Sequence, residues 1–193
     1  MRSFEEARAR LCDPRHEVSA HWLVAEDGRT LALVPEERRA WHAGAGAWGE
    51  VTDVNSRSVG IELCNTGAHP YPAPQMVALE ALLRGVLHRW AIPPERVIGH
   101  SDTAPARKSD PGPRFDWRAL ALGGLSVWPE QGTPGDLSAD LAAIGYRGED
   151  ADVLRAFRLR FFPGATGPVT GAERAAAADL AARFPVDRTR ARA

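Results

Sequence analysis

Alternating apolar and polar residues predict three strands in the first half of the chain. Residues 18–24 and 30–34 alternate on either side of Asp27-Gly28, a dipeptide typical of tight turns, so they should form an antiparallel hairpin. Residues 58–64 alternate as well, which places their apolar side chains on one face of a third strand and Glu62 on the other.

Apolar residues three and four positions apart predict helices beside these strands. This spacing recurs through residues 75–90, and Ser3 and Glu6 have the spacing of a capping box, so another helix should begin near Ser3. Residues 96–100 predict a short buried strand that ends at His100. Strands separated by helices indicate an α/β fold, with a mixed central β-sheet flanked by helices.

The last third of the chain predicts a separate helical unit. Helical patterns occupy residues 136–144, 150–162 and 171–184, after a stretch rich in glycine and proline. We therefore divide the chain into an α/β domain at 1–129, a linker at 130–135 and a small three-helix domain at 136–193.

Composition and charge exclude several classes of protein. With 193 residues, 44% hydrophobic and 25% charged, the chain has the composition of a folded globular protein. Its 24 basic and 25 acidic residues give a net charge of -1, which provides no field for binding nucleic acid. Cys12 and Cys64 form no metal-binding or redox motif.

The same sequence carries no apolar run long enough for a membrane span, and its first residues contain no signal peptide. We expect a monomer without a transmembrane segment, cytoplasmic as written. The location becomes the periplasm or cell envelope if an export signal lies upstream.

The chemistry is concentrated in residues 99–112. His100 and Asp110 lie ten residues apart in a loop containing proline and glycine, where an imidazole and a carboxylate can converge on one divalent cation such as zinc. On spacing alone, a simple hydrogen-bonded pair is the commoner outcome. A serine hydrolase using Ser101 or Ser109 with His100 is a weaker interpretation, because neither serine lies in a GxSxG turn.

Four segments in order resemble one family. Residues 18–24 (VSAHWLV), 40–44 (AWHAG), 58–63 (SVGIEL) and 99–112 (GHSDTAPARKSDPG) are similar to those of the zinc-dependent N-acetylmuramoyl-L-alanine amidases of the type-2 class, relatives of peptidoglycan recognition proteins and phage lysozyme-amidases. The resemblance covers about residues 1–129.

The resemblance implies a role for each matched residue. His100 and Asp110 would be two ligands of a Zn²⁺ ion that activates a water molecule. Glu62 would take a proton from that water and pass it to the departing amine, and Lys108 would stabilise the developing oxyanion.

Substrate contacts are expected from the segments around residues 39–55. Arg39, Trp41 and Asn55 lie where related enzymes contact the glycan or the stem peptide. His42 is also a candidate, although His42 and His21 can equally be core histidines whose ring protons are bonded.

One feature departs from the family pattern. In the family, a further zinc-binding histidine ends a first central strand, and neither that strand nor that histidine can be placed in this chain. Either the natural start lies upstream of Met1, which we favour because Glu62, His100, Lys108 and Asp110 persist, or the chain is a homologue that binds peptidoglycan without cutting it.

The C-terminal helices are similar to small three-helix peptidoglycan-binding domains. A helical extension that covers the amidase surface is the alternative. The sequence thus predicts a zinc-dependent hydrolase of the amide between N-acetylmuramic acid and L-alanine, acting on peptidoglycan or muropeptides in cell-wall turnover or recycling. A non-catalytic peptidoglycan-binding protein is the alternative function.

Overall fold

A computed structural model describes residues 3–187 of the chain. Within that range the structure combines a small sheet with helices along most of its length. The elements are α1 (Phe4–Cys12), η1 (Pro14–His16), β1 (Trp22–Val24), β2 (Thr30–Ala32), η2 (Val54–Ser56), β3 (Ile61–Leu63), α2 (Ala73–Trp90), η3 (Pro94–Arg96), α3 (His100–Thr103), α4 (Trp117–Leu122), α5 (Leu137–Ile144), α6 (Asp150–Phe161) and α7 (Gly171–Arg183).

The sheet confirms the predicted α/β class. Its order is β2-β1-β3, with β1 antiparallel to β2 and parallel to β3, so the sheet is mixed and the hairpin is present. The register pairs Leu23 with Leu31 on one side and with Glu62 on the other. All three strands are shorter than the alternation predicts. Glu62 nevertheless lies in the predicted third strand, as the central residue of β3.

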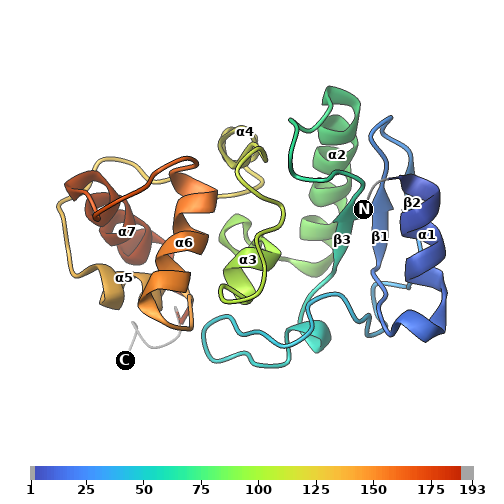
Figure 1. Ribbon diagram of the computed structural model, residues 1–193, viewed down its shortest axis with the longest axis horizontal. Helices are drawn as coiled ribbons and strands as arrows, with labels where there is room; N and C mark the ends of the chain where they lie inside the picture. Colours follow the sequence, from blue (N-terminus) through green and yellow to red (C-terminus); the bar gives the residue numbers. More distant parts are fainter. Residues whose placement is uncertain (1–2, 188–193) are drawn as a thin grey trace.

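Helices enclose this sheet and continue beyond it. Figure 1 shows the sheet between α1 and α2, with α3 and α4 next along the molecule and α5, α6 and α7 at the far end. The first helix begins as expected, because the Ser3 side chain accepts a hydrogen bond from the Glu6 amide at 3.1 Å. No helix within residues 3–187 is long and apolar enough to cross a membrane.

The predicted strand at residues 96–100 is wrong. A 3₁₀ turn ends at Arg96, and His100 already begins α3. The backbone between them bonds to side chains instead of a neighbouring strand: the Gly99 amide donates to Asp102 at 2.8 Å, and the Val97 carbonyl accepts from Arg160 at 3.0 Å. An apolar stretch whose backbone groups are satisfied in this way has no need of a sheet partner.

The predicted helices at the C-terminus are present and share a core with the rest of the protein. Their buried side chains pack around Trp48, which comes from the loop before β3 and is 6% exposed. The Gly49 amide donates to the Gly145 carbonyl at 2.8 Å. Gly145 has φ 132°, and a Cβ there would lie 2.6 Å from the Trp48 ring, so this contact requires glycine. Trp48 thus joins the loop before β3 to the core of the C-terminal helices, and the predicted division at 130–135 stays a prediction. Residues 1–2 and 188–193 of the predicted units lie outside the described range.

Glu36 fastens the hairpin to the end of α2. Its carboxylate accepts hydrogen bonds from Trp22 at 2.8 Å, Arg89 at 2.6 Å and Trp90 at 2.6 Å. The hydrogen bond from Arg89 is the largest cause that holds the pKa of Glu36 at about 2, well below its ordinary value of 4.5. The ionised form is thus strongly favoured in the folded protein.

We expect Glu36→Gln to lower the free energy of unfolding by about 2–3 kcal/mol at neutral pH, since each unit of pKa difference corresponds to ~1.4 kcal/mol. The folded pKa lies below the unfolded one, so this stabilisation is complete above the unfolded pKa and is lost as the pH falls towards the folded value of about 2. Urea unfolding at neutral pH and in acid measures the gap between the wild type and the variant, which should shrink in acid. Glu37→Gln, at the exposed neighbour, is the control; an equal loss there would contradict the assignment.

Candidate functional site

Glu62, His100, Lys108 and Asp110 come from two parts of the fold. Glu62 lies at the centre of β3, and His100 is the first residue of α3. The loop after α3 folds back on it, because the Ser101 amide donates to the Asp110 carbonyl at 2.9 Å. This bond places Asp110 beside the helix that starts at His100.

His100 and Asp110 face each other directly. His100 Nδ1 lies 3.1 Å from Asp110 Oδ2, and His100 Nε2 lies 2.9 Å from the Ala43 carbonyl oxygen. Because a carbonyl oxygen only accepts, Nε2 must carry a proton, which leaves Nδ1 of a neutral ring as an acceptor. Two acceptors at this distance repel each other unless a proton or a cation lies between them.

This pair fits zinc in kind but does not complete a zinc site. Imidazole nitrogen and carboxylate oxygen are both zinc ligands, and ligand bonds of ~2.0–2.1 Å in a tetrahedron place neighbouring ligand atoms ~3.3 Å apart. The 3.1 Å separation is close to that value. Among residues 3–187, however, no third His, Cys, Asp or Glu joins them in a metal-binding group. The described residues therefore provide two protein ligands where a hydrolytic zinc site has three.

Asp110 is stabilised as a carboxylate by His100. Desolvation acts to raise its pKa, but the hydrogen bond and the charge of His100 outweigh it, and the pKa lies below the ordinary value. An ionised carboxylate is the form that a cation requires.

Glu62 has the opposite environment. Burial raises the pKa of its carboxyl, and the negative charge of Asp110 raises it further, against the positive charges of His100 and Lys108. Glu62 therefore lies within electrostatic reach of His100, Lys108 and Asp110. A carboxyl whose pKa is shifted towards neutrality is suited to accept and return a proton.

His21, just before β1, and His42, in the loop of residues 40–46, differ in their hydrogen bonding. His21 is 1% exposed, accepts a hydrogen bond at Nδ1 from the Gly60 amide at 2.8 Å and donates from Nε2 to the Arg38 carbonyl at 2.9 Å. It is a core histidine with both ring nitrogens bonded. His42 lies edge-on to it, with ring centroids 5.4 Å apart. A Cβ at Gly60 would lie 2.3 Å from the His42 ring, so only glycine fits beneath it.

Burial lowers the pKa of His42 to about 4, helped by the charges of His21 and His100. Its ring is therefore neutral at physiological pH. Its Nε2 atom is buried and has no hydrogen-bond partner among the described residues.

The remaining substrate-binding candidates lie together near the same loop. The Arg39 guanidinium stacks on the Trp41 ring at 4.3 Å, and the Trp41 side chain is 55% exposed. Asn55 is buried, and its amide oxygen accepts from the amides of His42 and Ala43 at 3.0 and 2.8 Å. Asn55 thus shapes the loop, while Arg39 and Trp41 form an exposed platform. A substrate contact by any of these residues, or by His42, stays a prediction.

Sequence reasoning missed two supports of the site. Arg107 donates to the carbonyls of Ala43 and Ala45, which ties the loop of residues 40–46 to the loop that carries Asp110. Asp102 is completely buried and bonds to Arg160 of α6 and to Tyr146, which follows α5. A buried carboxylate two residues after His100 leaves no signal in the sequence, because its partners are distant along the chain.

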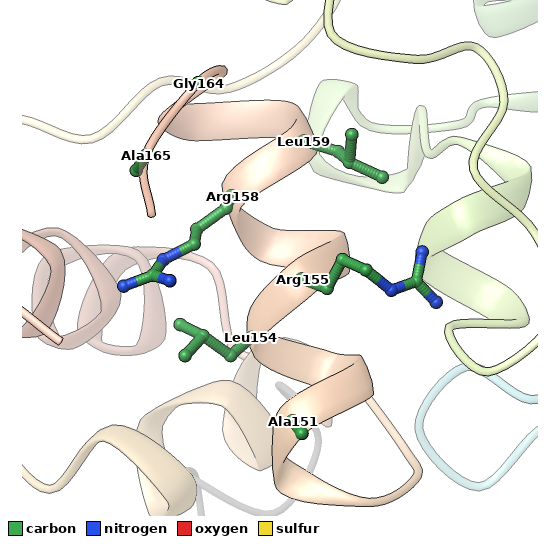
Figure 2. A pocket seen from close by; sticks show the side chains of 7 residues that line it. All are labelled: Ala151, Leu154, Arg155, Arg158, Leu159, Gly164 and Ala165. Atoms are coloured by element: carbon green, nitrogen blue, oxygen red, sulfur yellow. The ribbon is translucent and has the colours of Figure 1, made fainter. Parts of the chain in front are cut away.

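A pocket of about 190 Å³ lies beside α6. Figure 2 shows Arg155 and Arg158 leaving α6 on opposite sides of it. Its lining residues are Ala151, Leu154, Arg155, Arg158, Leu159, Gly164 and Ala165. None of the predicted site residues is among them.

Comparison with known families identifies the fold that carries this arrangement. The family model described as N-acetylmuramoyl-L-alanine amidase (Amidase_2) matches residues 1–113, more than half of the chain. The chain belongs to this amidase family. The matched region contains β1, β2, β3 and α3, and so includes every predicted site residue.

Individual relatives extend the likeness. N-acetylmuramoyl-L-alanine amidase AmiD of Escherichia coli is 34% identical over 198 residues, which cover 83% of this chain and 71% of the relative. The 1,6-anhydro-N-acetylmuramyl-L-alanine amidase AmpD of Enterobacter cloacae is 41% identical over 100 residues, 52% of this chain and 54% of that protein. The chain thus matches about half of the length of AmpD.

Solved structures agree with this relationship. A complex of E. coli AmiD with the substrate anhydro-N-acetylmuramic acid-L-Ala-D-gamma-Glu-L-Lys superimposes with a TM-score of 0.85 at 33% identity, over 95% of this chain and 86% of that chain. AmpDh3 of Pseudomonas aeruginosa gives 0.84 at 29% identity, over 94% and 88%. Because these matches span 95% and 94% of this chain, the C-terminal helices belong to the shared fold.

Glu62→Gln should increase the free energy of unfolding at neutral pH by about 0.5–2 kcal/mol, as removal of a strained functional group commonly does. The reason is that burial penalises the ionised carboxylate, and the neutral amide escapes this penalty. The wild type should gain stability as the pH falls through the raised pKa of Glu62, and the variant should lack that gain. Urea denaturation measures both effects; a variant less stable than the wild type would contradict the assignment.

Proposed function

We propose that this protein hydrolyses the amide between N-acetylmuramic acid and L-alanine in muropeptides. The observation that carries the proposal is the cluster of Glu62, with its raised pKa, and the facing pair His100 and Asp110. The AmiD complex supports it, because that relative holds an anhydro-muramyl tripeptide as substrate. Anhydro-muropeptides released during cell-wall turnover are therefore the preferred candidates for the substrate.

His100 and Asp110 are the residues that would hold zinc. Bound zinc lowers the pKa of a coordinated water molecule to about 7 and polarises a carbonyl oxygen. The proposal requires a third ligand besides these two, because the described residues supply no other. Ala43 contributes indirectly, since its carbonyl holds His100 Nε2–H and so turns Nδ1 towards Asp110.

Glu62 moves the proton. As a carboxylate it accepts a proton from the attacking water while the water oxygen bonds to the carbonyl carbon of the lactyl amide. It then gives this proton to the L-alanine nitrogen as the carbon–nitrogen bond breaks. The products are a free lactyl carboxyl group and a free stem peptide. A raised pKa suits both halves of this cycle.

Lys108 and the exposed platform act on the substrate. The ammonium group of Lys108, within electrostatic reach of Glu62 and Asp110, would stabilise the oxyanion that forms on the carbonyl oxygen. Arg39 and Trp41 would contact the sugar or the stem peptide from the platform that they form. His42 and Asn55 are the inner candidates.

One observation favours a second function. Because only two metal ligands are present among residues 3–187, the chain as given can bind muropeptide without cutting it. Muropeptide recognition by the C-terminal helices at 136–193, whose last residues lie outside the described range, is part of that same alternative.

Activity decides between the two functions. With zinc supplied, release of free stem peptide from an anhydro-muramyl tripeptide, followed by chromatography and mass spectrometry, is the expected result. Glu62→Gln should lower kcat about 10²–10⁴-fold with little change in KM, because it removes the proton acceptor and leaves binding intact. Glu80→Gln on α2 is a matched control and should leave the rate unchanged. Binding without release in the wild type would establish the second function instead.

Zinc binding tests the metal ligands separately. Titration of the metal-free protein with Zn²⁺ in a calorimeter should show weak binding that His100→Ala and Asp110→Ala each abolish, since each removes one of two ligands. Cys12→Ser, at an exposed cysteine in α1, is the control and should leave zinc binding unchanged. Tight stoichiometric zinc in all variants would contradict the assignment of these ligands.

A further inference from the structure

We propose that α6 of the C-terminal helices holds the segment from His100 to Asp110 in its working conformation, through Arg155 and Arg160 together with Tyr146. These are positioning residues: they touch the segment that carries the site, and not the substrate. The inference rests on the proposed function of that segment, and it assigns the C-terminal helices a role in the amidase site itself.

The first contact lies immediately behind His100. Asp102 is completely buried, and its Oδ2 atom accepts hydrogen bonds from the Gly99 amide at 2.8 Å and from Arg160 Nη1 at 2.9 Å. Its Oδ1 atom accepts from the Tyr146 hydroxyl at 2.8 Å. A buried carboxylate without such partners is strongly destabilising, so the start of α3 depends on groups that the C-terminal helices supply.

Arg160 also holds the chain just before His100. It is 4% exposed, and its Nη2 atom donates to the Val97 carbonyl at 3.0 Å and to Ser126 Oγ at 3.1 Å. Its guanidinium stacks on the Trp117 ring at 4.3 Å. Arg160 thus bonds to the Val97 backbone before His100 and to the Asp102 side chain after it, with the planar geometry that distinguishes arginine from lysine.

The second contact lies at the other end of the segment. Arg155, one to two turns before Arg160 on α6, donates to the carbonyls of Pro105 and Lys108, the latter at 3.4 Å. Figure 2 shows its side chain pointing from α6 towards the green part of the chain that contains α3. The loop between His100 and Asp110 is therefore held on both sides by one helix.

Arg158 on the same helix provides a matched comparison. Figure 2 shows it pointing the other way, towards α7. Its guanidinium bonds to Glu173 at 2.5 Å and to the carbonyls of Gly167 and Pro168. These partners lie in α7 or in the loop before it, so removal of Arg158 disturbs α6 without removing a bond to the segment that carries His100.

Amide hydrogen exchange in the full-length protein tests the proposal. The reporters are four amides whose hydrogen bonds lie inside the segment: Ser101, Ala104, Arg107 and Lys108. Tyr146→Phe and Arg155→Ala each remove one set of bonds from α6 or its neighbour and keep the buried Asp102–Arg160 pair, so both variants should fold. We expect these amides to exchange about 3- to 30-fold faster in each variant, the effect of losing one or two hydrogen bonds, with a larger effect in the double variant.

The control defines what would overturn the proposal. Arg158→Ala should speed exchange in α6 and α7 while the four reporters keep their wild-type rates. Unchanged reporters in Tyr146→Phe and Arg155→Ala would refute a bracing role, and so would equal acceleration in Arg158→Ala, because the effect would then be general destabilisation. The readout needs no turnover; absence of hydrolysis in the wild type would count against the proposed function alone.

Discussion

The carboxylate of Asp102 has no contact with water, and the position of the candidate site depends on how its charge is compensated. Two groups from the C-terminal helices and one backbone amide surround it. Removing such a partner costs several times more than an ordinary hydrogen bond, about 3–5 kcal/mol when a buried pair is broken. A buried charge that must be compensated by hydrogen bonds therefore lies directly behind His100, the first residue of α3.

The side of α3 that carries His100 has a different electrostatic requirement. When the His100 ring is neutral, His100 and Asp110 present two acceptor atoms to each other, an arrangement that is stable only with a proton or a metal ion between them. Glu62, on the neighbouring strand, is made a better base by burial and by the charge of Asp110. Rigid support behind the helix and unsatisfied acceptors in front of it are what a preorganised metal or proton-transfer site needs.

Local patterns in the sequence were sufficient for the hairpin, for α2 and for the three C-terminal helices, because turn chemistry and helical spacing are properties of neighbouring residues. The strand expected at 96–100 failed for the opposite reason. Its backbone partners are the side chains of Asp102 and Arg160, and the latter lies 63 residues from Val97. The four residues of the candidate site were found through motifs, whereas the choice between a core and a cleft position for His21 depended on backbone groups that only the folded chain brings near it.

Trp48 is a second point, outside the candidate site, at which the first part of the chain depends on contacts with the C-terminal helices. Its ring belongs to the loop before β3 but lies in the core of α5, α6 and α7, against a glycine that leaves room for it. Cutting the chain at the glycine-rich stretch near residue 132 would expose the Trp48 indole to solvent on the N-terminal fragment. It would also leave a cavity in the core of α5, α6 and α7 on the C-terminal fragment. The packed core of this protein is therefore built from residues on both sides of position 113, where the match to the family model ends.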